Sequence, residues 1–172
     1  MSEGKADVLD AVVDQATLEA WAAEVGRLAH RPLTVCLHGP LGAGKSVVAR
    51  AVARGAGVRG AMPSPTFNLR FSYRLPGGGY LLHIDLYRLS PSEIWDVGWE
   101  DVGAAGIVAL VEWAERARRL LPEDRWDVRL SPVQGLAARR RLEVRRLGDA
   151  PPIPSLPVAE RHAAGSGASG GA

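Results

Sequence analysis

Eight consecutive residues, from Gly39 to Ser46, have the types and spacing of a phosphate-binding loop. Their sequence, GPLGAGKS, matches the pattern G-x-x-x-x-G-K-[ST] at every fixed position. Glycines let the backbone curl so that successive N–H groups point at an anion, and a helix beginning near Lys45 adds the positive end of its dipole. We expect Lys45 to reach the β- and γ-phosphates of a nucleotide and the Ser46 hydroxyl to ligate Mg²⁺. The alternative is a plain glycine-rich turn between a strand and a helix.

Two acidic residues follow buried apolar runs and could share this magnesium ion. Glu112 ends the run IVALV, and Asp85 ends LLHI. Both carboxylates are therefore expected at strand ends beside the loop. For each acid, the alternative is a structural cap or an ion pair. The period of two puts Asp85 on the same sheet face as His83, which we interpret as a core or supporting histidine, because one histidine and one carboxylate are too few for zinc.

Two further residues are candidates for the same site. Thr66, in the segment Ser64-Pro65-Thr66, lies in the loop after the predicted phosphate-loop helix, where many such proteins place a γ-phosphate sensor. Thr66 could contact the γ-phosphate or order a water, or it could only start a strand after a proline turn. Trp113 could cover the nucleotide pocket or fill the core, and the residues alone favour the core.

The hydrophobic pattern predicts the elements that must position these residues. A short buried strand is expected over 33–38, directly before the loop, and a helix over 46–57, directly after it. The other predicted elements are a helix over 17–30 capped by Asp14 or Thr17 and ended by Pro32, a hairpin of strands 67–75 and 80–87, short helices over 90–98 and 113–121, a buried strand over 107–112, and closing strands over 125–130 and 138–147. Together they predict a three-layer α/β domain of the P-loop NTPase type with a mixed sheet.

Composition sets the limits of this domain. The chain has 172 residues, 47% hydrophobic and 23% charged, as in an ordinary soluble globular protein. We expect a P-loop ATPase domain over 1–147 and a disordered tail over 148–172, where Pro, Gly, Ser and Ala dominate. No apolar run approaches the ~18 residues of a membrane span, and the acidic start is unlike a secretory signal, so we expect a cytoplasmic location without membrane contact. The single cysteine, Cys36, is predicted to be a buried, inert thiol.

Charge is distributed unevenly along the chain. Residues 1–26 carry one basic and six acidic side chains, whereas residues 116–146 carry ten arginines and four acidic side chains. The basic segment could meet a polyanion or an acidic partner, but a solvated arginine-rich strand face is the favoured interpretation. Only Lys5 and Lys45 are lysines, in a chain that otherwise uses arginine.

The assembled motifs resemble those of the TsaE family, also called YjeE, the bacterial P-loop ATPases required for threonylcarbamoyladenosine modification of tRNA. The resemblance covers roughly residues 15–145. It rests on Ala16-Thr17-Leu18, GPLGAGKS, SPTF at 64–67, HIDLYRL at 83–89 and Glu112-Trp113. HIDLYRL followed by a Glu-Trp pair is far more specific than the phosphate loop alone.

The resemblance implies a role for each matching residue. ATP would be held by Leu41, Gly42, Ala43, Gly44, Lys45, Ser46 and Val47, with Trp113 beside them and Thr17 near the base. Mg²⁺ would be associated with Ser46, Glu112 and Asp85, and the hydrolytic site would comprise Lys45, Asp85, Glu112 and Thr66. The chain departs from the family at Pro40, where aspartate is usual, and at Ser46, where threonine is usual; serine keeps the oxygen ligand.

The resemblance also implies partners, namely the threonylcarbamoyl transferase TsaD and its paralogue TsaB, with tRNA contacted indirectly through them. This chain would hydrolyse ATP, slowly by itself and faster with partners, to cycle that complex at tRNA position A37. Two alternatives stay open: a small-molecule kinase on the same scaffold, and a nucleotide- or tRNA-binding module with negligible turnover that uses the arginines of 139–146. The absence of an N-K-x-D signature favours adenine over guanine.

Overall fold

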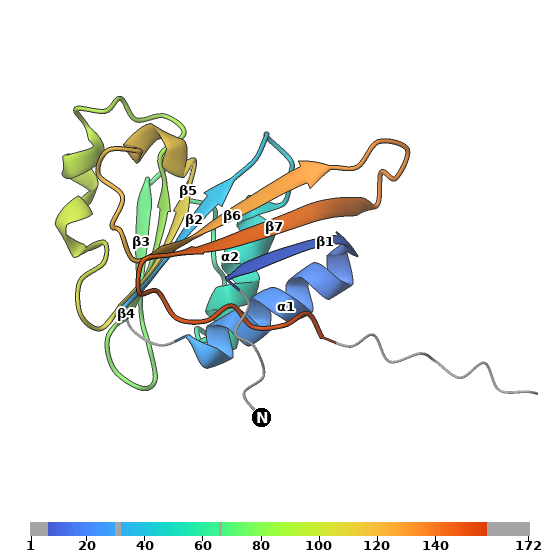
Figure 1. The fold of residues 1–172 in the computed structure, drawn as a ribbon. Helices are drawn as coiled ribbons and strands as arrows, with labels where there is room; N and C mark the ends of the chain where they lie inside the picture. Colours follow the sequence, from blue (N-terminus) through green and yellow to red (C-terminus); the bar gives the residue numbers. More distant parts are fainter. Residues whose placement is uncertain (1–6, 30–31, 66, 158–172) are drawn as a thin grey trace, which may run out of the picture.

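A single mixed sheet of seven strands organises the computed structural model, which describes residues 7–29, 32–65 and 67–157. The strands are β1 (Val8–Asp14), β2 (Leu33–His38), β3 (Arg70–Arg74), β4 (Tyr80–Asp85), β5 (Ile107–Glu112), β6 (Arg125–Pro132) and β7 (Arg139–Leu147). Their order across the sheet is β1-β7-β6-β2-β5-β4-β3 (Figure 1). The central strands β6, β2, β5 and β4 pair in parallel and the outer ones antiparallel, which confirms the predicted mixed sheet.

Two α-helices cover one face of the sheet: α1 (Gln15–Leu28) and α2 (Lys45–Gly55). In Figure 1, β6 and β7 run in front of α2. The two helices approach each other closely because glycines lie at their contact, Gly26 on α1 and Gly55 on α2. A Cβ atom at either position would collide with backbone of the other helix. Asp14 caps α1 as predicted, its Oδ1 accepting a 2.8 Å hydrogen bond from the Thr17 N–H, and this bond lowers the pKa of the carboxyl.

The other face is covered by three single turns of 3₁₀ helix: η1 (Ile94–Val97), η2 (Trp99–Asp101) and η3 (Ala114–Ala117). The turns η1 and η3 lie within the short helices predicted over 90–98 and 113–121, whereas η2 lies outside both ranges. Ser90 and Glu93 form half of a capping box before η1, since the Ser90 N–H donates to the Glu93 carboxylate over 2.9 Å. Gly98, at φ +70°, then ends η1 after four residues. With these turns the domain has three layers.

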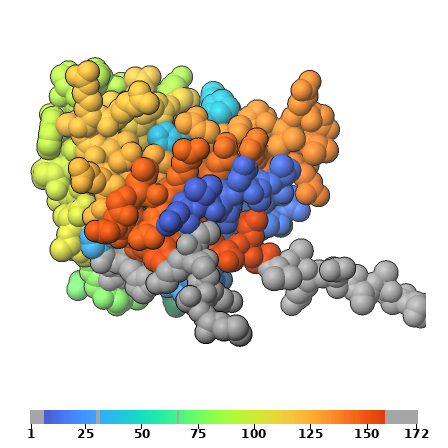
Figure 2. Space-filling model, in the orientation of Figure 1, coloured from blue at the N-terminus to red at the C-terminus, as the bar shows by residue number. Residues whose placement is uncertain are grey.

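The first strand, β1, is absent from the sequence prediction, which treats this segment only as acidic. It pairs antiparallel with β7, and blue β1 lies beside orange-red β7 at the surface in Figure 2. Asp10 pairs with Arg141 at 2.6 Å and Asp7 pairs with Arg146 at 3.0 Å. The acidic and basic ends of the chain therefore meet, and part of the arginine-rich segment is a solvated strand face, as predicted.

The boundary predicted at residue 148 is too early. Ala150 and Ile153 are buried in the same cluster as α1 and α2. Trp126 Nε1 donates to the carbonyl of Pro151 over 2.7 Å, and Trp21 Nε1 donates to the carbonyl of Pro154 over 3.1 Å. A buried indole N–H needs an acceptor, and this segment provides one for each tryptophan. Folded structure thus extends to residue 157, and the rest of the predicted tail, 158–172, lies outside the described residues. Within the described part, no helix has the length and apolarity needed to cross a membrane.

Candidate functional site

The predicted phosphate loop connects the end of β2 to the start of α2. Gly39, Gly42 and Gly44 have φ values of +141°, +78° and +109°, which favour glycine. A Cβ atom on Gly39 would also collide with the Leu130 carbonyl of β6. Gly44 is the N-cap of α2 and provides no side-chain hydrogen bond. No side chain of the N-cap residue therefore occupies the amides at the start of this helix. This is also the arrangement in an anion-binding loop, where the ligand accepts from those amides.

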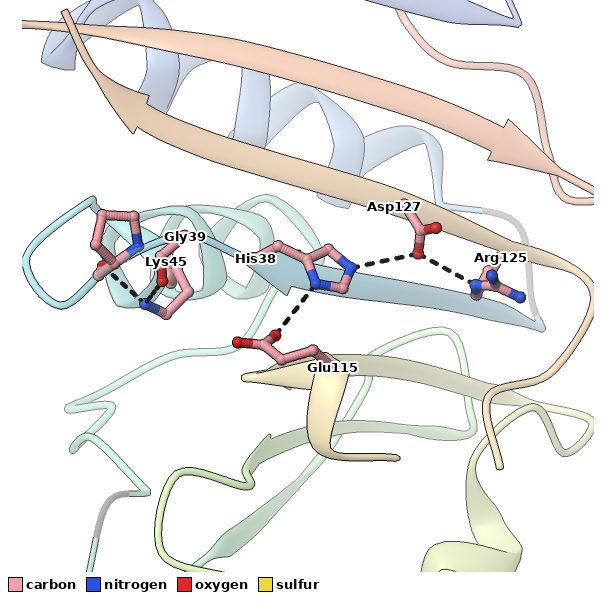
Figure 3. A network of polar contacts seen from close by, with 7 residues as sticks. His38, Gly39, Lys45, Glu115, Arg125 and Asp127 are labelled. Atoms are coloured by element: carbon pink, nitrogen blue, oxygen red, sulfur yellow. Dashed lines mark hydrogen bonds and ion pairs between the residues drawn. The ribbon is translucent and has the colours of Figure 1, made fainter. Parts of the chain in front are cut away.

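Lys45 is held beneath the loop. Its Nζ donates to the carbonyl of Gly39 over 2.6 Å and to that of Pro40 over 3.0 Å (Figure 3). The same atom lies 4.0 Å from the centroid of the Trp113 ring. Burial lowers the pKa of the ammonium, while the charges of Glu112, Glu115 and Asp85 oppose that shift. The residue is 5% exposed, so its N–H donors are confined to this pocket, where phosphate oxygens can replace the two carbonyl acceptors.

Glu112 forms buried hydrogen bonds with two other residues of the site. The Ser46 hydroxyl donates to its two oxygens over 2.9 and 3.1 Å, and His83 Nε2 donates to Oε1 over 2.8 Å. His83 is therefore a supporting histidine, one of the predicted options, although its buried Nδ1 has no partner among the described residues. Asp85 stands opposite Glu112 in the β4–β5 register and accepts from the Tyr87 N–H over 2.8 Å. The two predicted acids do meet beside the loop.

These groups line a cavity of about 290 Å³. Its lining comprises Leu41, Gly42, Gly44, Lys45, Ser46, Val47, Asp85, Tyr87, Glu112 and Trp113. Trp113 packs against a core cluster and also lines this cavity, so it combines the two predicted positions. The residue adopts a left-handed backbone at φ +58°, which leaves its ring half-buried against Lys45 and 4.8 Å from the Tyr87 ring. Sequence reasoning missed Tyr87, although the block HIDLYRL contains it.

A second cavity, of about 530 Å³, lies on the other side of the loop. It is lined by Asp14, Gln15, Ala16 and Leu18 from the start of α1, by Gly42, Ala43, Gly44 and Val47, and by Ala137, Ala138 and Arg140 before and within β7. Thr17 is not one of these residues; its N–H is directed to Asp14. The sequence prediction did not place Gln15 or Arg140 beside the loop, because only the closure of β7 onto the sheet brings them together. Thr66 lies outside the described residues.

The donors beside the loop suit magnesium. The Ser46 hydroxyl and the carboxylates of Glu112 and Asp85 are hard oxygen ligands, which Mg²⁺ prefers. Nowhere in the described ranges do three or more His, Cys, Asp or Glu side chains form a group that could hold a metal ion. The protein side chains would therefore supply only part of an octahedral shell, and water and phosphate oxygens would complete it.

Comparisons with known proteins show the family of this chain. A family model described as "Threonylcarbamoyl adenosine biosynthesis protein TsaE" matches residues 12–141. Proteins named tRNA threonylcarbamoyladenosine biosynthesis protein TsaE are similar to the chain. The Streptomyces coelicolor protein is 41% identical over 120 residues, which are 67% of this chain and 80% of that protein. The Treponema pallidum protein is 38% identical over 104 residues, 60% of this chain and 76% of that protein.

The Haemophilus influenzae relative is 37% identical over 94 residues, which cover 54% of this chain and 59% of its own length. A crystal structure of Bacillus subtilis YdiB superposes with a TM-score of 0.65 at 24% identity, over 82% of this chain and 86% of that one, which supports the fold. The range matched by the family model includes the loop and both acids. The chain therefore belongs to the TsaE family of threonylcarbamoyl adenosine biosynthesis proteins.

Proposed function

We propose that this protein binds ATP with Mg²⁺ and hydrolyses it in order to cycle the complex that modifies tRNA at A37. The observation that carries the proposal is the contact between Ser46 and Glu112. It joins the hydroxyl that ends the phosphate loop to a buried carboxylate on a neighbouring strand. Such a pair of oxygen groups, next to a lysine and a row of helix-start amides, suits a nucleotide polyphosphate and its metal ion.

The two cavities accommodate the two ends of the nucleotide. The triphosphate follows the loop into the smaller cavity, where Lys45 exchanges its carbonyl partners for the β- and γ-phosphate oxygens. The base occupies the larger cavity, whose wall combines apolar side chains such as Leu18 and Val47 with the polar groups of Gln15 and Arg140. Thr17 does not line this cavity. Its N–H donates to Asp14, which does, so Thr17 supports the wall without contacting the base.

Hydrolysis transfers the γ-phosphoryl group to water, giving ADP and inorganic phosphate. The ammonium of Lys45 neutralises charge on the oxygens between the β- and γ-phosphorus atoms. Ser46, Glu112 and Asp85 would hold Mg²⁺, which would supply further positive charge to the phosphate oxygens. Asp85 and Glu112 are the two acids that can orient the attacking water or hold the metal ion, and their opposition across β4 and β5 allows them to divide these roles. The Trp113 ring limits the access of bulk water to Lys45.

The cycle requires partners that respond to the nucleotide. By family membership these are TsaD and TsaB, and tRNA is reached through them. Turnover is slow in the isolated chain and rises in the complex, and the chain itself does not transfer the threonylcarbamoyl group. In the ATP-bound state the residues around the loop would present an ordered surface to the partner complex, and hydrolysis would release that surface.

The test compares ADP binding with ATP turnover, each with and without the TsaD–TsaB complex. Lys45→Ala is expected to abolish both, because the loop loses its mobile positive charge. Glu112→Gln is expected to retain ADP binding but to lower turnover about a hundredfold, or about 2.7 kcal/mol. Glu100→Gln, an exposed acid on η2, is the matched control.

Two outcomes would contradict the proposal. One is wild-type turnover in both loop-site variants. The other is transfer of the γ-phosphoryl group to a small-molecule acceptor instead of release as inorganic phosphate, which would favour the kinase alternative.

A further inference from the structure

The sheet carries a third cavity, of about 560 Å³, on the face opposite α2. We call it the arginine cleft. It is lined by His38, Glu115, Arg118, Leu121, Arg125, Asp127, Arg129, Glu143 and Arg145. The floor is the exposed face of β2, β6 and β7, and the wall is the segment that begins with η3. None of these residues lines either cavity beside the phosphate loop.

Strand register builds the floor. His38 of β2 stands beside Arg129 of β6, which pairs with Glu143 of β7. Two residues earlier in β6, Asp127 pairs with Arg145 of β7. Because side chains alternate along a strand, the residues between them, such as Val128 and Val144, point to the helix side and are buried there. The polar side chains consequently gather on the opposite face.

Part of the cleft is already neutralised by internal pairs. Arg125 Nε donates to Asp127 over 3.1 Å. His38 lies between two carboxylates, with Nδ1 3.2 Å from Glu115 and Nε2 3.4 Å from Asp127 (Figure 3). Burial alone would raise the pKa of Asp127, but the hydrogen bonds from His38 and Arg125 outweigh burial and lower it. Asp127 is thus ionised at neutral pH, and its charge is balanced by Arg125.

Three arginines of the cleft have no such partner. The side chains of Arg118, Arg129 and Arg145 are exposed and form no hydrogen bond or ion pair within the described ranges. Two other arginines of β7 form ion pairs: Arg141 with Asp10 and Arg146 with Asp7. Three unpaired guanidinium groups around one concavity raise the local concentration of anions.

We propose that Arg118, Arg129 and Arg145 bind a phosphate group that is attached to ribose, either in an RNA strand or in a free nucleotide. Arginine presents a planar fork that binds phosphate oxygens in pairs. The oxygens of a phosphate group are arranged tetrahedrally, so forks can approach them from several directions, whereas the two oxygens of a carboxylate lie in one plane. Glu115 and Glu143, in the wall and floor, repel a second adjacent anion but can accept hydrogen bonds from sugar hydroxyls. This combination favours a ribose phosphate over an acidic peptide. The proposal is independent of nucleotide binding by the phosphate loop.

The test uses the full chain in the Lys45→Ala background, so that the phosphate loop contributes little to anion binding. Binding of a fluorescein-labelled 12-nucleotide single-stranded RNA is followed by anisotropy over a series of salt concentrations. The double variant Arg129→Gln/Arg145→Gln is expected to bind at least about tenfold more weakly and to flatten the logarithmic salt slope by about one for each phosphate group that it no longer binds. A second double variant, Arg59→Gln/Arg74→Gln, makes the same change of net charge outside the cleft and is expected to stay within about twofold of the parent.

A second readout locates the ligand and identifies its source. The imidazole ¹⁵N signals of His38, assigned with His38→Gln, should shift when RNA or adenosine 5′-monophosphate is added. A shift with both identifies a site for any ribose phosphate, and a shift with RNA alone identifies an RNA site. Should Arg129→Gln/Arg145→Gln lose its cooperative thermal transition, Arg118→Gln, which lies outside the strands, replaces it.

Three results would overturn the proposal. The first is unchanged RNA affinity in Arg129→Gln/Arg145→Gln together with no His38 shift on addition of adenosine 5′-monophosphate. The second is an affinity loss of equal size in that variant and in Arg59→Gln/Arg74→Gln. The third is binding of a polyglutamate peptide that depends on the cleft arginines while neither RNA nor the nucleotide binds. The last result would assign the cleft to an acidic protein partner.

Discussion

His83 and Glu112 form a buried hydrogen bond of 2.8 Å that links β4 to β5 directly behind the phosphate loop. Neither side chain has appreciable access to solvent. The bond orients the carboxylate that also accepts from Ser46, so the histidine acts on the loop through Glu112.

Replacing His83 should therefore affect both stability and the site. His83→Leu leaves one oxygen of a buried carboxylate with fewer donors, which should cost about 1–3 kcal/mol in the free energy of unfolding, measured by urea denaturation. His83→Gln, whose amide can still donate, should recover part of that loss. Equal stability of the wild type and the leucine variant would show that the bond contributes nothing.

Ser46 should control the effect of magnesium on nucleotide affinity. Ser46→Ala removes the hydroxyl ligand but leaves the backbone amides and Lys45, so ADP binding with Mg²⁺ should weaken about tenfold, or about 1.4 kcal/mol, while binding in EDTA changes less. Ser46→Thr keeps the hydroxyl and is the matched control. Calorimetric titration measures both conditions, and an equal loss with and without Mg²⁺ would place Ser46 outside the metal site.

Cys36 should be unreactive in the folded protein. Burial raises the pKa of its thiol from 9.0 to about 12. Ellman's reagent at pH 8 should therefore label the chain only after it is unfolded in guanidinium. Because the unfolded thiol ionises first, its contribution to stability is complete below pH 9 and is lost as the pH rises from about 9 to about 12. Cys36→Ala lacks this contribution, and an identical pH dependence in the two proteins would contradict the assignment.

The segment after β7 should contribute to stability. A chain ending at residue 147 loses buried Ile153 and the acceptors of Trp21 and Trp126, whereas a chain ending at 157 keeps all three. The shorter chain no longer buries this isoleucine and leaves two indole N–H groups without their acceptors. It should therefore be less stable by about 3 kcal/mol or more. Thermal unfolding of the two truncated chains measures the difference, and equal midpoints would mean that the packing of this segment is without consequence.

The amino-acid sequence by itself determined the local features of the site. The loop from Gly39 to Ser46 is specified by residues next to one another, and the ends of β4 and β5 follow from short apolar runs that stop at Asp85 and Glu112. Both kinds of signal depend on backbone geometry over a few residues, so no distant contact is needed to recognise them.

Only the tertiary structure decided the features that depend on distant pairs. Strand β1 is stabilised by β7, more than a hundred residues along the chain, and residues 148–157 are ordered by two tryptophans that they meet only after folding. The left-handed backbone of Trp113 and the gathering of unpaired arginines in the cleft depend in the same way on packing and register. Such pairings are selected by burial and charge in three dimensions, where the order of residues along the chain no longer indicates which of them are neighbours.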